Sequence, residues 1–319
     1  MNLNYDLGGV EMFIDDLRRL EQAMRSQEML TKTLDYLADN MKKFLRPGEK
    51  LMICFDTQEP DNIGELLAKA ARKIGVTPLI PEDLRWKTML KLAFHSRATA
   101  ISAPPFVVLG LTKLAKHTQT PLNFHNVITV GYRCSNWIIE GIQKGLDCQV
   151  WGCYGPGNGA LVSGFSCNQE PVLHLRDDLF DFEILDEAGN ILPDGESGYV
   201  VITPKGMPQL RYHTAECAKM RRTPCACGCT SALLMDMYSG KDVDAFEEQL
   251  GRTLMLWTSV LDCRLRKGRQ GLEIELVTFP GEKLPPLPDC AGRVIRNWNP
   301  DVDRPYWFTP KWRKTDENG

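Results

Sequence analysis

The sequence predicts an α/β fold, with a mainly parallel sheet flanked by helices, then a small antiparallel β-barrel and a small α+β C-terminal domain. Between about residues 10 and 155, strand-like apolar runs alternate with amphipathic segments of helical period, as in crossover units of a parallel sheet. From residue 161 to 240, short β-rich runs are separated by turn clusters. At 319 residues, the chain has the length of one large domain plus a small one.

The composition is that of an ordinary soluble globular protein. Charged residues make up 25% and apolar residues 43% of the chain, and the net charge of −3 gives no basic stripe for nucleic acid. No apolar run approaches the roughly 18–20 residues of a membrane-spanning helix. The N-terminus, MNLNYDLGGVEMFIDD, is acidic and does not resemble a signal peptide. We therefore expect a cytoplasmic protein with neither nucleic-acid nor membrane partners.

The elements of the first half follow from the spacing of their apolar residues. Helical segments carry apolar residues three and four positions apart, whereas the strand segments are short continuous apolar runs. Ligands in such sheets bind at the carboxyl ends of the strands, here the loops after Val130 and Cys153. We predict helices over 10–24, 29–45, 62–75, 82–95, 106–117 and 136–145, and strands over 50–56, 76–81, 98–105, 126–131 and 148–155.

The second half changes pattern. The turn clusters DEAGN and PDGESG separate β-rich runs within 172–206, and further strands are predicted over 218–223 and 231–238. A helix over 245–256 and strands over 259–267 and 271–279 form the tail. We predict a large domain over 1–240, divided into an α/β layer (1–160) and a barrel (161–240), and a small C-terminal domain over 241–319.

Three pieces occur in a familiar order. CYGPGN closes the last parallel strand, ILDEAGNILPDGESGYVVIT forms a hairpin, and LRYHTAECAKM leads to PCACGCT. This run resembles the adenylate-forming (AMP-binding) superfamily, in its phenylacetate–CoA ligase-like branch. The resemblance covers roughly 45–250 and is specific only from about 148 to 245. It implies ATP-dependent activation of a small carboxylic acid through an acyl-adenylate, with magnesium as cofactor and CoA or a carrier protein as possible acceptor.

The resemblance also implies roles for individual residues. Glu216 stands where the family has its ribose-binding aspartate, and Asn158 stands where it has the glutamate that helps hold magnesium. An amide is a poorer ligand than a carboxylate for this hard cation. Candidates for binding the nucleotide are Gly131, Tyr154, Gly155, Arg211, Glu216 and Lys241, and candidates for catalysis are Asn158, Lys311 and Lys314. Taken singly, Tyr154 has a structural alternative in plugging the sheet end, and Arg211 in pairing with a surface carboxylate.

The phosphate loop of the family has no clear counterpart. Where a hydroxyl- and glycine-rich loop is expected, the sequence offers only YDLGGVEM, with Gly8 and Gly9 beside the negative charge of Asp6. We expect a chain shortened at its N-terminal side. A second hypothesis is therefore a weak or inactive relative that binds a nucleotide, acyl-adenylate or acyl-CoA, or a partner subunit; a homodimer is also possible.

Three cysteines, Cys225, Cys227 and Cys229, occupy alternate positions in RTPCACGCT. Joining i and i+2 by a disulfide is strained, which leaves a metal site, a redox role or plain packing. The resemblance adds Cys167 and His174, because several members of the branch carry such a pair alongside the C-x-C. The expected structural zinc site comprises Cys167, His174, Cys225 and Cys227. Cys229 is an alternative to His174, Cys217 is a weaker competitor, and Cys54, Cys148, Cys153 and Cys263 are interpreted as small apolar residues.

Overall fold

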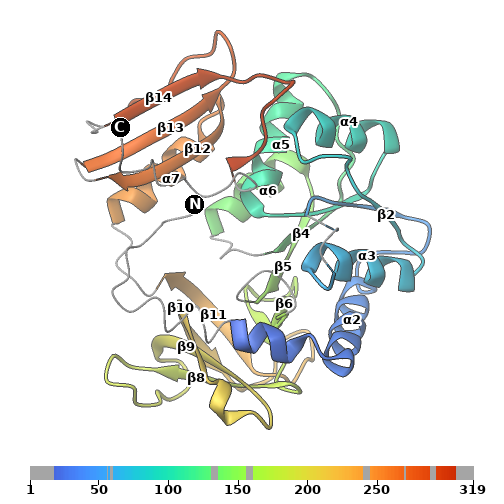
Figure 1. Cartoon of the computed structure of the whole chain (residues 1–319), viewed down its shortest axis with the longest axis vertical. Helices are drawn as coiled ribbons and strands as arrows, with labels where there is room; N and C mark the ends of the chain where they lie inside the picture. The colour runs from blue at the N-terminus through green and yellow to red at the C-terminus, as the bar shows by residue number, and fades with distance from the viewer. Residues whose placement is uncertain are drawn as a thin grey trace, which may run out of the picture.

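The computed structural model describes residues 18–55, 57, 60–130, 136–155, 161–239, 245–268, 271–287 and 292–306. Within these residues, a long curved sheet is flanked by helices, and a separate three-stranded sheet lies beside it (Figure 1). None of the helices described there is long and apolar enough to cross a membrane.

The first half is a parallel sheet with helices on both faces. The strand order is β2-β1-β3-β4-β5, and every pair in it is parallel. The strands are β1 (Lys50–Ile53), β2 (Thr77–Leu79), β3 (Ala100–Ala103), β4 (Asn126–Val130) and β5 (Gln149–Tyr154). The helices are α2 (Gln27–Met41), α3 (Ile63–Lys73), α4 (Trp86–Ser96), α5 (Pro105–His117) and α6 (Asn136–Leu146).

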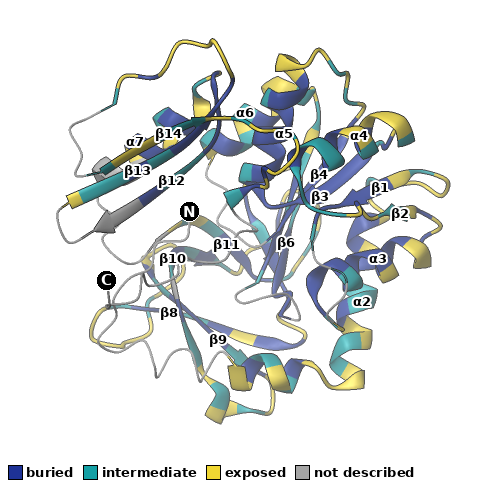
Figure 2. Ribbon diagram, turned by 45° about the horizontal axis from the view of Figure 1, so that its top comes forward, coloured by how far each residue is buried: buried dark blue, intermediate teal, exposed yellow. Residues whose placement is uncertain are grey.

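Side-chain alternation divides the interior of this half into two layers. In β1, Leu51 and Ile53 belong to the core beneath α2 and α3, whereas Met52 belongs to the core beneath α4, α5 and α6. Successive side chains of a strand point to opposite faces, so a strand covered on both sides must be apolar throughout. Figure 2 shows the central strands buried and the outer faces of the helices exposed.

Polar residues fix the starts of two helices. The side chain of Ser26 accepts a hydrogen bond from the backbone of Met29 at the start of α2. Asn62 does the same for Glu65 at the start of α3, and the Glu65 carboxylate accepts from the backbone of Asp61 at 2.6 Å. Each bond satisfies a backbone N–H group that has no partner within the helix.

The antiparallel half continues the same sheet. Cys153 of β5 pairs with Phe165, and the order continues as β6-β7-β11-β10-β9-β8. Leu20 and Met24, in a helical stretch before α2, belong to the core of this half. Its elements are β6 (Gly164–Ser166), β7 (Leu173–Leu175), β8 (Phe180–Leu185), β9 (Ser197–Pro204), a 3₁₀ turn (Pro208–Leu210), β10 (Tyr212–Arg221) and β11 (Leu233–Ser239).

A C-terminal lobe, defined here as the described residues from 245 to 306, completes the fold. It consists of α7 (Ala245–Leu256), β12 (Val260–Gly268), β13 (Gly271–Thr278) and β14 (Gly292–Asn297). The pair β12–β13 is antiparallel, but β13–β14 is parallel. The predicted fold class is confirmed. Two of the observed strands, β6 and β14, were not predicted from the sequence. The domain boundaries stay a prediction.

Candidate nucleotide site and metal cluster

Tyr154 and Glu216 meet at the carboxyl end of the last parallel strand. Tyr154 is the final residue of β5 and is buried, and its hydroxyl donates to Glu216 Oε2 at 2.7 Å. Burial, and then the negative charge of Glu216, raise the pKa of Tyr154 well above its usual value. The hydroxyl therefore stays protonated and acts as the donor in this bond.

An irregularity in β10 lies beside Glu216. The register between β10 and β9 shifts between His213 and Cys217, so the strand bulges at this point. Thr214 fixes the bulge, because its hydroxyl donates to the carbonyl of Val200 at 2.9 Å and accepts from the backbone of Glu216 at 3.2 Å. Bulges of this kind redirect side chains next to binding sites.

Gly155 has a steric reason to be glycine. A Cβ atom at this position would lie 1.7 Å from the carbonyl oxygen of Leu161, which no side chain tolerates. The chain therefore approaches the backbone of Leu161 closely just after Tyr154, and this local packing accounts for the glycine without a ligand.

Arg211 has a structural partner. Its Nε donates to Glu183 Oε2 of β8 at 2.8 Å, and both side chains are partly exposed. This contact is the structural alternative that the sequence left open for Arg211. The remaining predicted nucleotide and catalytic residues lie outside the described residues and are Gly131, Asn158, Lys241, Lys311 and Lys314.

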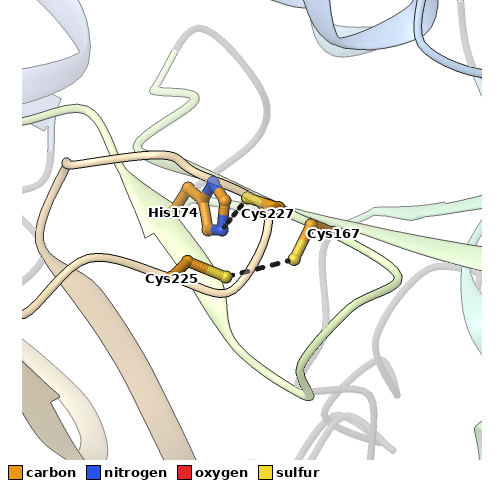
Figure 3. Close-up of side chains that lie close together, drawn as sticks. All are labelled: Cys167, His174, Cys225 and Cys227. Atoms are coloured by element: carbon orange, nitrogen blue, oxygen red, sulfur yellow. Dashed lines mark hydrogen bonds between the residues drawn. The ribbon is translucent and has the colours of Figure 1, made fainter.

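Four predicted metal ligands come together in the antiparallel half. The ligand atoms of Cys167, His174, Cys225 and Cys227 all lie within 4.8 Å of one another. The Sγ atoms of Cys167 and Cys225 are 3.6 Å apart, and Cys227 Sγ is 3.6 Å from His174 Nε2 (Figure 3). A tetrahedral zinc ion with Zn–S bonds of about 2.3 Å has ligand atoms about 3.8 Å apart, so the cluster fits this ion in size and in ligand type.

Neighbouring strands and a tight turn position these four side chains. Cys167 directly follows β6, and His174 lies in β7, where it pairs with Phe165 on one side and Leu233 on the other. The cysteine loop between β10 and β11 closes through hydrogen bonds from Cys225 N to Cys229 O and from Gly228 N to Cys225 O, each 2.9 Å long. Gly228 has a φ of +86°, a conformation that favours glycine.

Glu170 supports the cysteine loop and was not foreseen from the sequence. Its Oε1 accepts from the backbone of Ala226, between Cys225 and Cys227, at 2.6 Å, and its Oε2 pairs with Arg221 at 2.7 Å. No sequence signal distinguishes this glutamate from a surface carboxylate, because its partners, Arg221 and Ala226, are more than 50 residues away in the chain.

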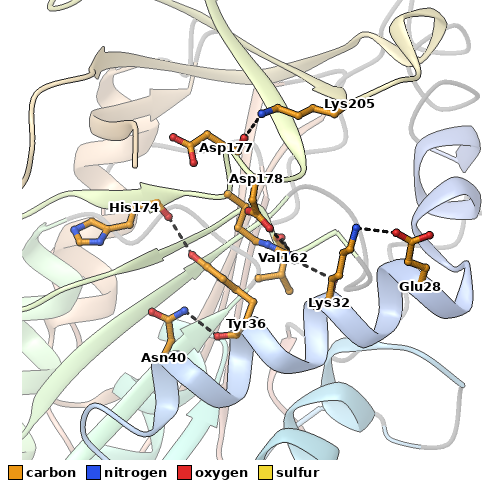
Figure 4. Close-up of polar contacts among 11 residues, drawn as sticks. Glu28, Lys32, Tyr36, Asn40, Val162, His174, Asp177, Asp178 and Lys205 are labelled. Carbon is orange, nitrogen blue, oxygen red and sulfur yellow. Dashed lines mark hydrogen bonds and ion pairs between the residues drawn. The ribbon is translucent and has the colours of Figure 1, made fainter. Parts of the chain in front are cut away.

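Helix α2 also contacts the strand that carries the metal-ligand candidate His174. The hydroxyl of Tyr36 donates to the backbone carbonyl of His174 at 3.1 Å, which ties the helix to β7 (Figure 4). Arg176, almost fully buried, lies over the ring of Tyr36 at 4.6 Å and donates to Thr33. Burial, and then nearby Lys43, lower the pKa of His174, which favours the neutral imidazole that binds metals.

The other cysteines stand apart from the cluster. Cys229 Sγ lies 3.3 Å from the hydroxyl of Ser231, and Cys217 is buried in β10. Neither belongs to the group of four ligand atoms found among the described residues. Cys54 and Cys153 are buried in apolar surroundings, as expected for small hydrophobic residues.

A depression of about 500 Å³ lies at the opposite end of the sheet, lined in part by Lys43, Arg46, His125 and Trp151. Lys43 donates to the side chain of Asn40, and Arg46 donates to backbone carbonyls of its own turn. Both cationic side chains are exposed and form hydrogen bonds with residues close in the chain. The depression is therefore an open hollow on the surface, at the other end of the sheet from Tyr154.

No family model matches the sequence, and no curated protein matches it. Solved structures do match in fold. A 2-hydroxyisobutyryl-CoA ligase in the postadenylation state, in complex with R3-HIB-AMP, has a TM-score of 0.66 at 11% identity, over 90% of this chain and 69% of that one. The chain has the fold of adenylate-forming ligases.

Two further structures agree with this fold. A benzoate CoA ligase from Burkholderia xenovorans LB400 has a TM-score of 0.54 at 12% identity, over 85% of this chain and 63% of the other. The amide bond synthetase McbA from Marinactinospora thermotolerans has a TM-score of 0.50 at 15% identity, over 87% and 65%. The chain therefore spans about two thirds of the length of these enzymes. At these identities the similarity shows a shared fold.

Proposed function

We propose that this protein binds an adenine nucleotide at the carboxyl end of β5 and activates a small carboxylic acid as its acyl-adenylate, with CoA or a carrier thiol as acceptor. The observation that carries the proposal is the contact between Tyr154 and Glu216, within a fold shared with ligases solved with acyl-adenylates. A carboxylate held at this end of a parallel sheet is suited to accept hydrogen bonds from ribose hydroxyls.

In this proposal, Glu216 binds the ribose and the buried hydroxyl of Tyr154 orients its carboxylate. From the resemblance, Gly131 and Lys241 are proposed to contact the nucleotide, and Asn158 is proposed as a magnesium ligand. Magnesium, when bound, neutralises charge on the phosphates as pyrophosphate leaves. Lys311 and Lys314 are the proposed groups for the developing negative charge.

The proposed zinc site is structural. Three thiolates and one imidazole would complete a tetrahedral shell, with no position left for substrate. Zinc at Cys167, His174, Cys225 and Cys227 would join β6, β7 and the cysteine loop, and its contribution is to folding rather than to the reaction.

A second candidate function is nucleotide or acyl-adenylate binding with little turnover. One stretch of the sequence favours this second function. YDLGGVEM contains no serine or threonine whose hydroxyl could help to hold a triphosphate. Loss of a single preorganised donor in such a site typically costs on the order of 100-fold in rate. Without a phosphate loop, from this protein or from a partner chain, we expect adenylation well below about 1 per second, the lower end of the usual enzyme range.

Calorimetric titration with AMP and with ATP–Mg²⁺, followed by a pyrophosphate-exchange screen over aryl and short aliphatic acids, tests both functions. Binding together with exchange for one acid class supports the ligase. Binding without exchange for any acid supports the second candidate. Absence of binding to both nucleotides contradicts the two together.

A further inference from the structure

The sheet of the C-terminal lobe is covered on both faces. On one face, Leu250 and Leu254 of α7 pack with Leu276 in a small core that belongs to the lobe alone. On the other face, four apolar side chains of the lobe pack in the same core as α4, α5 and α6. They are Met255, Leu261, Val277 and Phe279. Leu276 and Val277 are neighbours in β13 and serve opposite faces, as strand geometry requires.

The helix layer approaches this second face closely. A Cβ atom at Gly110 of α5 would lie 3.2 Å from the carbonyl oxygen of Leu261 and 2.3 Å from the ring of Trp86. The ring of His117, at the end of α5, stacks on Phe279 at 4.1 Å and 7°. Figure 1 shows the three-stranded sheet beside the helix layer that contains α5 and α6.

Polar contacts across the same interface reach backbone groups. Lys113 of α5 donates its amine to the carbonyl of Met255, at the end of α7, at 2.9 Å, and also to the carbonyl of Val260. Met255 lies in the last turn of α7 and Val260 is the first residue of β12, so one lysine contacts both elements. A cation at this place also suits the negative end of the α7 dipole.

The segment after β14 adds a second attachment. The backbone of Trp86, at the start of α4, donates to the carbonyl of Asp303 at 3.1 Å. Arg85 donates to the carbonyl of Asp301 at 2.7 Å, and Lys87 pairs with the Asp301 carboxylate at the same distance. Strand β14 and its tail are therefore joined to α4 independently of the contacts of β12 and β13.

From this interface, we infer that the C-terminal lobe is a fixed part of the α/β body, clamped by Lys113 and anchored by Phe279, and that nucleotide binding does not swing it. Domain contacts that open are commonly small and polar, whereas this one is an apolar core shared by both sides. Opening would expose that core to water and leave the carbonyls of Met255 and Val260 without their amine.

The inference goes beyond the proposed function, because it concerns the free protein as well as any complex. The 2-hydroxyisobutyryl-CoA ligase has been solved in postadenylation, open and thioesterification states. If this chain does activate an acid, every step would take place against one unchanging position of the lobe.

Hydrogen–deuterium exchange of the full chain, alone and with AMP, ATP–Mg²⁺ or CoA, tests the inference. In the free protein, peptides covering 105–117 and 255–265 should exchange as slowly as those of β3 and β4, because they open only with the whole body. Their rates should change less than about twofold with each ligand. A separate, faster opening of these peptides, or acceleration of about tenfold or more with any ligand, would overturn the inference.

Substitution at the anchor gives the matched comparison. Phe279→Ala should accelerate exchange in 105–117 and 255–265 by about tenfold or more while leaving β3 and β4 unchanged. Val294→Ala, on the same small sheet but 53% exposed, should change neither region. Equal, small effects of both substitutions would contradict the anchoring role of Phe279. If Phe279→Ala does not fold, the measurements on the unaltered chain still decide.

The same experiment separates this inference from the proposed function. Nucleotide binding should protect peptides covering β5 and β10, which carry Tyr154 and Glu216. No protection there, with slow exchange at the interface, would reject the nucleotide site and leave the fixed lobe intact. Protection there, together with a loosened interface, would support the site and reject the fixed lobe.

Discussion

Tyr154 Oη and Glu216 Oε2 lie 2.7 Å apart and join the end of the parallel half of the sheet to a bulge in its antiparallel half. The two residues are far apart in the chain, and each was chosen from a different motif. Their contact brings a buried donor and a carboxylate to one place at the sheet end. The first prediction tests whether this carboxylate is used.

Replacing Glu216 by Ala should weaken AMP binding about tenfold or more, because a carboxylate accepting ribose hydroxyls makes charge-assisted bonds of about 1.5–3 kcal/mol each. Glu183→Ala is the matched control, since it removes a carboxylate from the neighbouring region, where its partner is Arg211. Calorimetric titration measures both. Unchanged AMP affinity in Glu216→Ala would remove Glu216 from the site.

Metal content tests the cysteine cluster. Protein purified without chelator should hold about one zinc per chain, as expected for one closed tetrahedral site. Cys225→Ser should lower the melting temperature by more than about 5 °C, because a structural metal contributes to folding. Cys229→Ser should have a smaller effect, since Cys229 lies outside the group of four. Metal-free protein with unchanged melting would show that the cluster is only packed thiols.

Glu170 should tune the affinity of the same site. Its carboxylate holds the backbone of Ala226 between two of the cysteines, so Glu170→Ala should loosen the loop. Loss of such outer partners typically lowers metal affinity about 10–100-fold. The neighbouring Gln169→Ala, on an exposed residue, is the control. Competition with a chromophoric chelator gives both affinities, and equal values would leave Glu170 without a role in the metal site.

The sequence was most informative where local chemistry decides the structure. Alternating apolar runs and helical periods located the parallel half, and the turn clusters located the hairpins, because both patterns depend on residues close in the chain. Cys225 and Cys227 came from a short motif, whereas Cys167 and His174 came from the family resemblance. The structure brings the four ligand atoms within 4.8 Å of one another.

Contacts between segments far apart in the chain could not be predicted from the sequence. Arg211 matched a nucleotide-binding motif, yet its guanidinium pairs with Glu183, and nothing local marks that pairing. The parallel strand β14 follows a long connection after β13, and its pairing is set only by the folded sheet. The attachment of the lobe through Lys113 depends likewise on tertiary packing rather than on any motif.

Asp262 gives the lobe a characteristic pH dependence. Its carboxylate is buried and accepts from the backbones of Cys263 at 2.9 Å and Tyr306 at 2.7 Å. Burial outweighs these bonds and raises the pKa of Asp262 to about 6. The unfolded carboxyl titrates near about 3.9, so between these two values the folded protein keeps a proton that the unfolded chain has released. The contribution of Asp262 to the free energy of unfolding therefore falls as the pH rises from about 4 to about 6.

Asp262→Asn removes this titration. Relative to the variant, the unaltered protein should lose on the order of 2 kcal/mol of unfolding free energy between pH 4.5 and 7. Urea unfolding at both values measures the difference, and contributions shared by the two proteins cancel in it. Asp301→Asn is the control with the opposite sign, because hydrogen bonding to Lys87 lowers the pKa of Asp301, an exposed residue whose ion pair contributes little. A constant difference between Asp262→Asn and the unaltered protein across this range would mean that the Asp262 carboxyl titrates normally and is open to water, which would also weaken the case for a closed interface around Lys113.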